Sequence, residues 1–180
     1  MSLRIVQGNL IDEMLNARYE VAIQGCNCLS IQGSGLATQM VAHFNTSSIT
    51  YFEMESKVNT GRWFHRPENK LGCIDYGEFY VNGTRALFID ELTRGRKDEP
   101  VVTIVNCYTQ IAPGIPGKYG IPLDYDALTL CLRKINLIFE GRTIAIPYLI
   151  GCGLAQGDEH KVLNIIDNEL VNCKPTLIRL

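Results

Sequence analysis

The chain has 180 residues, of which 46% are hydrophobic and 20% charged, and its formal net charge at pH 7 is −2. These values predict one globular domain over residues 1–180, and they argue against the strongly basic surface that duplex nucleic acid requires. No signal-peptide pattern and no apolar run of membrane-spanning length occurs. We therefore expect a soluble, cytoplasmic protein that is monomeric and has no membrane partner.

The seven cysteines predict buried thiols rather than disulfides or a zinc site. Their number is odd, and Cys107 and Cys131 lie inside apolar runs. Cys26 and Cys28 are separated by one residue, and no C-x-x-C pair with zinc-binding spacing occurs. A reducing compartment accounts best for this pattern.

Strands and helices alternate in the N-terminal part of the chain. Apolar patterning predicts a strand, a helix, a strand and a helix at residues 4–7, 11–18, 21–24 and 36–44. The first glycine-rich loop, Gly33-Ser34-Gly35, precedes the second helix, and Ser34 can cap that helix.

The middle of the chain is less regular. Residues 46–72 lack periodicity, so we expect a loop with one helical turn. Asn82-Gly83 stands between two β-rich runs, which predicts a hairpin. A buried strand at 101–108 ends at Thr109-Gln110. The proline- and glycine-rich segment 112–122 follows, either as a plain connector or as a flap over a pocket.

The C-terminal part begins with the clearest amphipathic helix, which Asp124 caps and Gly141 closes. We expect its buried face to comprise Leu128, Cys131, Leu132, Ile135, Ile138 and Phe139. The apolar run at 144–150 predicts a strand buried on both faces. A second glycine-rich loop, Gly151-Cys152-Gly153, follows it. Asp158 then begins a last helix, whose inward side chains are Val162, Ile165, Ile166 and Leu170, and residues 176–180 form a final strand.

Alternating strands and helices predict a mostly parallel sheet with helices on both faces and right-handed crossovers. Such sheets bind ligands beyond the carboxyl ends of their strands. Asn27, Gln110 and the second glycine-rich loop follow three of these ends and can converge there. The second loop suits either an anion site or an ordinary strand-to-helix turn. The P-loop and dinucleotide fingerprints are both missing, which disfavours P-loop NTPases and Rossmann oxidoreductases.

With its loops in this order, the chain resembles the macro domains, a family that binds ADP-ribose. The resemblance covers nearly the whole chain and rests on Gly8-Asn9-Leu10, on residues 24–37, on the strand 105–110 and on residues 146–158. It implies a three-layer α/β/α fold with a mixed, mostly parallel central sheet. The second loop, G-C-G-L-A-Q-G-D, is most similar to the branch that removes phosphate from ADP-ribose 1″-phosphate.

The resemblance also implies which residues bind the ligand. Backbone N–H groups of the two loops would hold the diphosphate, Asn27 would orient the distal ribose, and Asn9 replaces the aspartate that usually accepts from the adenine amino group. The implied ligand-binding residues are Gly8, Asn9, Leu10, Asn27, Gly33, Ser34, Gly35, Leu36, Ala37, Gln110, Ile150, Gly151, Cys152, Gly153, Leu154 and Ala155.

The residues implied to be catalytic are Asp158, Asn27 and His160. Asp158 matches the aspartate of the phosphatase-like loop, where it would act as acid–base or orient water. His160 assists it or is simply exposed, and Lys118 either neutralises phosphate charge or is a surface lysine. Cys152 has no paired histidine, so we expect it to pack against the ligand rather than act as a nucleophile. We expect no metal and no other cofactor.

Three functions stay open at this point. The first is hydrolysis of ADP-ribose 1″-phosphate, although Gln156 and Glu159 depart from the loop of that branch. The second is hydrolysis of ADP-ribose from modified macromolecules, which is disfavoured because Gln110 stands where some macro domains have a nucleophilic lysine. The third is a non-catalytic ADP-ribose reader.

Overall fold

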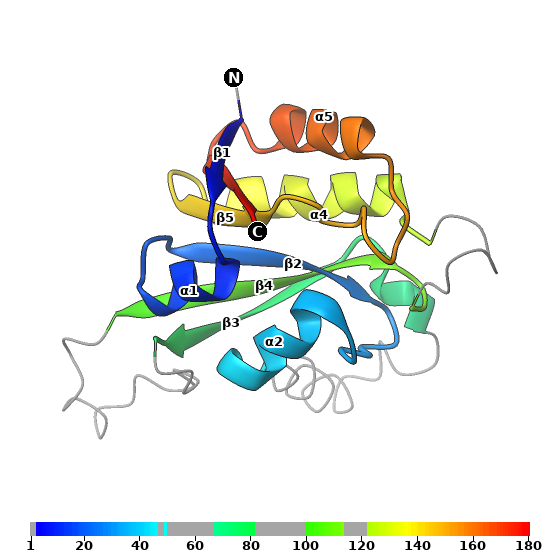
Figure 1. Cartoon of the computed structure of the whole chain (residues 1–180). Coiled ribbons are helices and arrows are strands. Elements are labelled where there is room, and N and C mark those ends of the chain that lie inside the picture. Colours follow the sequence, from blue (N-terminus) through cyan, green and yellow to red (C-terminus); the bar gives the residue numbers. More distant parts are fainter. Residues whose placement is uncertain (1–2, 47–48, 50–66, 82–99, 114–121) are drawn as a thin grey trace.

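The computed structural model describes residues 3–46, 49, 67–81, 100–113 and 122–180. They form a six-stranded sheet in the order β1-β6-β5-β2-β4-β3 (Figure 1). The strands are β1 Arg4–Gln7, β2 Val21–Asn27, β3 Ile74–Tyr80, β4 Val101–Gln110, β5 Thr143–Pro147 and β6 Lys174–Arg179. The helices are α1 Leu10–Leu15, α2 Gly35–Phe44, α4 Tyr125–Ile138 and α5 Glu159–Glu169, and η1 Pro67–Lys70 is a 3-10 turn.

Among the described strands only β3 runs antiparallel to its neighbour, β4; the other pairings are parallel. Helices α4 and α5 cover one face of the sheet, and α1 and α2 cover the other (Figure 1). The expected three-layer α/β/α fold with a mixed, mostly parallel sheet is therefore confirmed.

Each face of the sheet has its own apolar core. Ile23 and Val105 point toward α4 and α5, whereas their neighbours Ala22 and Ile104 point toward α1 and α2, as the alternation of side chains along a strand requires. The predicted inward face of α4 is confirmed except at Ile138, which is 50% exposed. The helix ends at that residue, and its side chain faces solvent.

Side-chain caps fix three of the helix starts. Asn9 accepts from the backbone N–H of Ile11, Asp124 from that of Ala127, and Asp158 from that of Lys161. The expectations for Asp124 and Asp158 are thus confirmed. Ser34 occupies the cap position of α2, but its side chain makes no cap hydrogen bond.

Several predicted boundaries are wrong. The second strand continues three residues beyond 24 and ends at Asn27, because its partner β4 also continues, to Gln110. The predicted strand 144–150 ends at Pro147, where turn hydrogen bonds replace sheet pairing. The first helix stops at Leu15, before Ala17 adopts a left-handed conformation with φ of 51°.

Other expectations fall partly or wholly outside the described residues. This is true of the hairpin at Asn82-Gly83 and of most of the segment 112–122. Within 46–72, η1 supplies the expected helical turn. No helix in the described part of the chain combines the length and the apolar character needed to cross a bilayer.

All seven cysteines are free thiols. Five are buried as expected, whereas Cys73 and Cys152 are half-buried. Burial raises the pKa of Cys28 and of Cys173 to about 11. Desolvation likewise raises the pKa of the Cys26 thiol well above its usual value. These thiols are therefore protonated at neutral pH.

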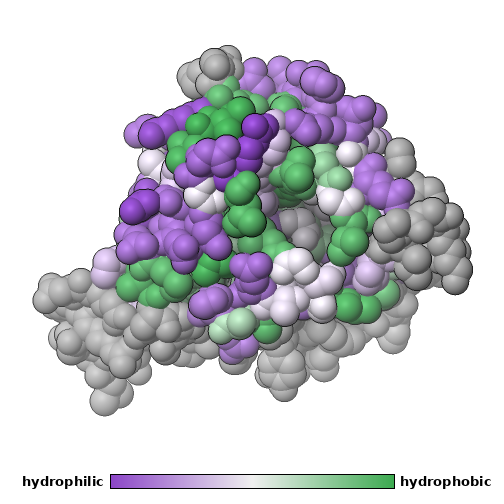
Figure 2. All heavy atoms as spheres, viewed as in Figure 1, coloured by the Kyte–Doolittle hydropathy of each residue, from purple (hydrophilic) through white to green (hydrophobic). Residues whose placement is uncertain are grey.

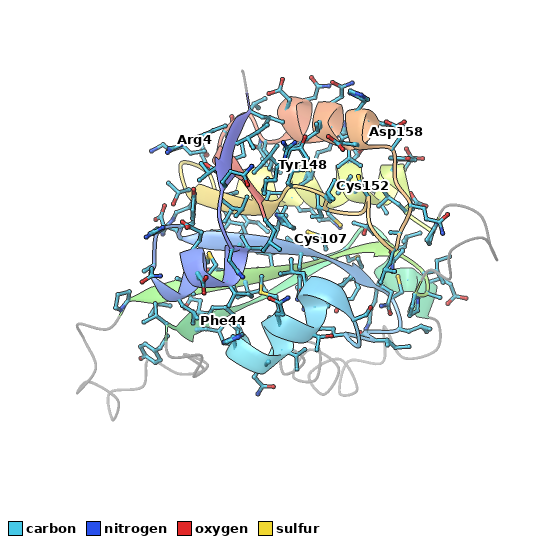
Figure 3. All side chains as sticks on the ribbon, in the orientation of Figure 1. Arg4, Phe44, Cys107, Tyr148, Cys152 and Asp158 are labelled. Atoms are coloured by element: carbon cyan, nitrogen blue, oxygen red, sulfur yellow. The ribbon has the colours of Figure 1, made fainter. Side chains whose placement is uncertain are left out.

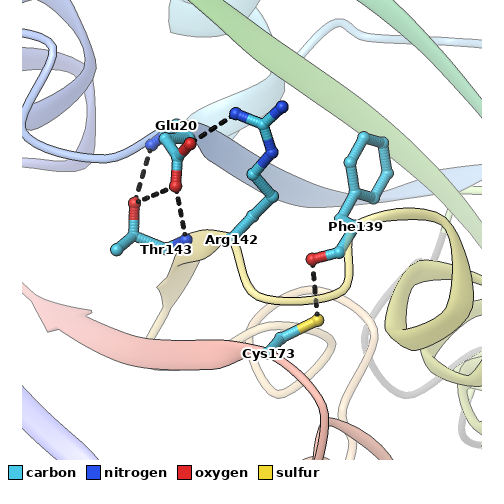
Figure 4. Close-up of polar contacts among 5 residues, drawn as sticks. All are labelled: Glu20, Phe139, Arg142, Thr143 and Cys173. Carbon is cyan, nitrogen blue, oxygen red and sulfur yellow. Dashed lines mark hydrogen bonds and ion pairs between the residues drawn. The ribbon is translucent and has the colours of Figure 1, made fainter.

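The amino-terminal ends of β2 and β5 are held together by Glu20 (Figure 4). Its carboxylate accepts the backbone N–H of Thr143 at 2.9 Å, and the Arg142 guanidinium also donates to it. The Thr143 hydroxyl in turn accepts the backbone N–H of Glu20 at 3.1 Å. The Thr143 N–H contributes most to lowering the pKa of the Glu20 carboxyl, and Arg142 adds to it.

Replacing Glu20 with Gln should lower Tm at pH 7 by roughly 1–3 °C, because a partly exposed ion pair contributes little. Since the folded-state pKa of Glu20 is lowered, its contribution is full above the unfolded carboxyl value of about 4.3. This contribution to stability is lost as the pH falls through the lower pKa that Glu20 has in the folded protein. Thermal melts at pH 7 and pH 3 should show the Tm difference shrinking. The exposed Glu140→Gln variant is the control, and an equal difference at both pH values would contradict the prediction.

Candidate functional site

Three parallel strands end beside one another at one edge of the sheet: β2 at Asn27, β4 at Gln110 and β5 at Pro147. A pocket of about 540 Å³ opens there. The described residues that line it are 24–27, 31–37, 109, 110, 113, 147, 149–151 and 153–155. Figure 2 shows a hollow near the middle of the view, bordered by green apolar and pale near-neutral residues. The pocket thus lies between the two glycine-rich loops, as the sequence predicts.

The first loop presents the start of α2 to the pocket. Asn27 shapes this loop, since its amide donates to the carbonyl of Ile31 at 2.8 Å and accepts the Ile31 N–H at 3.1 Å. Gly35, the first residue of α2, has φ of 59°, and no atom lies within 4 Å of the position that a Cβ would take. Because Ser34 does not cap the helix, N–H groups at this start stay available to an anion.

The second loop is closed by a hydrogen bond between the Gly157 N–H and the Gly151 carbonyl, at 2.9 Å. Leu123, just before α4, packs against both glycines. A Cβ on Gly151 would lie 2.8 Å from Leu123 Cδ1, and φ at Gly151 is 73°. A Cβ on Gly157 would overlap Leu123 and lie 2.7 Å from the Gly151 carbonyl oxygen. Glycine is therefore required at both positions.

Two tyrosines bind the residues that directly follow the second loop. The Tyr125 hydroxyl accepts the Asp158 N–H at 2.9 Å, and the Tyr148 hydroxyl donates to Glu159 at 2.6 Å. The Arg179 guanidinium lies 3.7 Å from the centre of the Tyr148 ring. These contacts tie the start of α5 to the first residue of α4 and to the residue after β5.

The pocket brings together most of the residues that the sequence singles out. Its lining contains these predicted residues: Asn27, Gly33, Ser34, Gly35, Leu36, Ala37, Gln110, Ile150, Gly151, Gly153, Leu154 and Ala155. Loop segments about 120 residues apart in the sequence therefore share one site.

Five other predicted residues do not line this pocket: Gly8, Asn9, Leu10, Asp158 and His160. The first three lie on the same edge of the sheet, because Gly8 follows β1 and its N–H donates to the Arg179 carbonyl at the end of β6. Asp158 and His160 belong to the exposed start of α5 (Figure 3 labels Asp158).

Cys152 is also absent from the lining, although it belongs to the second loop (Figure 3). Its thiol contacts the Ile150 carbonyl, and burial raises its pKa. A raised pKa opposes a nucleophilic role, in agreement with the sequence analysis. Lys118 lies outside the described residues.

The described lining carries no Asp, Glu, His, Lys or Arg side chain. Its polar side chains are neutral: Gln24, Asn27, Gln32, Ser34, Thr109 and Gln110. Ile31, Leu149 and Leu154 form an apolar rim, each with about half of its surface exposed. In the described part of the chain no cluster of three potential metal ligands occurs. Such a lining offers a ligand neutral dipoles and apolar contact rather than charge.

Sequence reasoning missed Leu123, Tyr125 and Tyr148. Their roles depend on contacts between segments far apart in the chain, and no local motif marks such contacts. The apolar Leu123 immediately before a helix cap was the only available hint.

Comparison with known proteins identifies the fold. No protein-family model matches the chain. An uncharacterised 17.5 kDa protein of Enterobacteria phage T4 is 26% identical over 171 residues, which cover 93% of this chain and 89% of the phage protein.

Solved structures agree over nearly the whole chain. A Bacteroides thetaiotaomicron protein of unknown function has a TM-score of 0.64 at 18% identity, covering 100% of this chain and 99% of its own. The macrodomain of Mycobacterium tuberculosis DarG has a TM-score of 0.55 at 18% identity, with 98% of both chains covered. Thermosipho africanus DarTG in complex with ADP-ribose has a TM-score of 0.61 at 13% identity, with 99% of this chain and 42% of that one covered. The chain therefore has the macrodomain fold.

Replacing Gly157 with Ala should destabilise the protein by roughly 1–3 kcal/mol, the usual cost of overpacking. The added methyl would collide with Leu123 and with the Gly151 carbonyl, so the second loop must shift. Gly153→Ala is the matched control, because no atom lies within 4 Å of its Cβ position. Urea unfolding of both variants measures the effect, and equal stabilities would contradict the account of the loop.

Proposed function

We propose that the protein binds ADP-ribose in the pocket between the two glycine-rich loops. The observation that carries this proposal is the pocket itself. Its described lining is uncharged, and it lies between the two glycine-rich loops. The first of these loops leads into the start of α2, which has no side-chain cap. Such a site suits a diphosphate that is gripped by N–H groups rather than by lysines. A solved structure with the same fold, that of Thermosipho africanus DarTG, is in complex with ADP-ribose.

In this proposal the diphosphate lies between the start of α2 and the second loop. The unengaged hydroxyl of Ser34 and the N–H groups of residues 35–37 face it from one side. The backbone of residues 151–154 faces it from the other. Because Leu123 already holds the second loop, little conformational entropy is lost on binding.

The two ends of the ligand would point in opposite directions along the sheet edge. The distal ribose would lie beside Asn27, whose amide already bonds Ile31 and keeps one further donor and acceptor site. The adenine would point toward Gly8-Asn9-Leu10, past the ends of β5 and β6. The Asn9 side-chain oxygen accepts from Ile11 and has a second lone pair for the adenine amino group.

We further propose that the protein hydrolyses ADP-ribose 1″-phosphate. Water would attack phosphorus, the bond to the C1″ oxygen would break, and ADP-ribose and inorganic phosphate would leave. Asp158 would orient the water, with His160 beside it. Support comes from the second-loop sequence, which Asp158 directly follows at the start of α5.

A non-catalytic ADP-ribose reader is the second candidate. It is favoured because the Cys26 thiol is the only ionisable side chain in the described lining, which therefore offers no acid–base group suited to catalysis. Hydrolysis of ADP-ribosylated macromolecules through a nucleophilic lysine has less support, because no lysine lies in that lining.

Replacing Gly33 with Val should weaken ADP-ribose binding about tenfold or more. Gly33 lines the pocket, and only a side-chain atom of Ile31, at 3.9 Å, approaches its Cβ position. The variant should therefore fold normally while its side chain occupies ligand space. Calorimetric titration with ADP-ribose measures the affinity and a thermal melt tests the fold. Ala42→Val on the exposed side of α2 is the control. Undiminished affinity in Gly33→Val would place the ligand elsewhere.

Replacing Asp158 with Asn separates the phosphatase from the reader. Asparagine also caps helices, so α5 should keep its start. If the protein is a phosphatase, phosphate release from ADP-ribose 1″-phosphate should fall by about 100-fold or more, with ADP-ribose affinity retained. A wild-type protein that binds ADP-ribose but releases neither phosphate nor protein-linked ADP-ribose is a reader.

A further inference from the structure

Two buried amides in the central strands are only half satisfied. Gln24 on β2 is 1% exposed and Asn106 on β4 is 0% exposed. The Gln24 amide nitrogen donates to the Asn106 side-chain oxygen at 2.7 Å. This bond leaves Gln24 Oε1 and Asn106 Nδ2 without a hydrogen-bond partner. A buried polar atom without a partner is costly, so its place in the molecule needs a reason.

The side chain of Gln24 lies on the face of the sheet that α1 and α2 cover. Ala22, two residues earlier on β2, packs with the α1 and α2 core, and side chains two residues apart share a face. Gln24 is itself part of the pocket lining, together with Leu36 and Ala37 from the start of α2. Gln24 therefore forms part of the pocket wall, where its unpartnered oxygen is buried.

An acidic residue, Asp75, is the other neighbour of Asn106 in the sheet. Asn106 stands opposite Gln24 on one side and opposite Asp75 of β3 on the other. A carboxylate only accepts hydrogen bonds, and Asp75 already accepts the Tyr108 hydroxyl. The Asn106 oxygen accepts from Gln24, and the Asn106 nitrogen makes no hydrogen bond. Gln24 then donates to Asn106, and its oxygen remains free to accept.

We infer that Gln24 is a specificity-determining residue whose Oε1 accepts a hydrogen bond from a hydroxyl of the sugar that enters the pocket. This inference rests on the proposed function, under which that sugar is the terminal ribose of ADP-ribose. The Gln24 nitrogen can keep its bond to Asn106 while the oxygen accepts from the ligand, because the two contacts use different atoms of the amide. A ligand without this ribose leaves the acceptor unpaired, and sites built in this way reject such ligands strongly.

Titration calorimetry with ADP-ribose and with ADP, which lacks the terminal ribose, tests the inference. Gln24→Met removes the acceptor and keeps the length of the side chain. Its affinity for ADP-ribose should fall roughly 5- to 100-fold, whereas its affinity for ADP should stay within about twofold of wild type. Gln39→Met, on the exposed side of α2, is the control and should leave both affinities unchanged.

A second variant guards against a folding defect, because Gln24→Met leaves the Asn106 oxygen unpaired. Gln24→Met combined with Asn106→Leu removes both amides, and replacing both partners by apolar groups is close to neutral for stability. This double variant should show the same selective loss for ADP-ribose.

The outcomes separate this inference from the proposed function. A wild-type protein that does not bind ADP-ribose overturns the proposed function. If the wild-type protein binds ADP-ribose, two results would overturn the role of Gln24 alone. In the first, the variants keep the wild-type affinity for both ligands; in the second, they lose affinity for ADP-ribose and ADP equally. Either result would mean that the Gln24 oxygen is satisfied by an internal water.

Discussion

The parallel pairing of β2 with β4 on one side and β5 on the other is the constraint on which the site depends. Parallel neighbours end at the same edge, so three loops that are distant in sequence must meet there. Glu20 secures the opposite end of this arrangement by joining the start of β2 to Thr143 of β5. The pocket is thus a consequence of strand direction before it is a consequence of any single side chain.

Under the proposed function, backbone geometry would do what charged side chains do in other anion sites. Leu123 occupies the space that side chains at positions 151 and 157 would need, so the second loop keeps its N–H groups in fixed directions. The start of α2 supplies further donors because Ser34 leaves them uncapped. A slightly acidic protein can therefore offer a site for a diphosphate without a cluster of lysines.

Local signals predicted most elements and both loops. Apolar runs and period-3.6 patterns located most of the described strands and helices, and Asp124 and Asp158 were identified correctly as caps. The errors lie where tertiary contacts override local pattern. Strand β2 extends through Gly25 because β4 pairs with it. The apolar residues after Pro147 leave the sheet, although their composition is typical of a strand.

The site was predictable as far as its motifs reach. Glycine-rich turns and strand-end amides are visible in sequence, and they do line the pocket. The supporting contacts are not visible, since Leu123 on Gly157 and Gln24 on Asn106 join segments whose approach only the fold determines. The neutrality of the described lining also emerges only when the segments are assembled.

The buried thiols have a practical consequence for measuring how this fold opens. Alkylating reagents attack thiolates, and burial both shields Cys28 and Cys173 and keeps their pKa near 11. Labelling of these residues must therefore wait for a local or global opening. Cys173 contacts the Phe139 carbonyl beyond the end of α4, whereas the Cys28 N–H donates to the Gln110 carbonyl at the end of β4. Mass spectrometry of the two sites would thus report separately on the breathing of two regions, with no probe added to the chain.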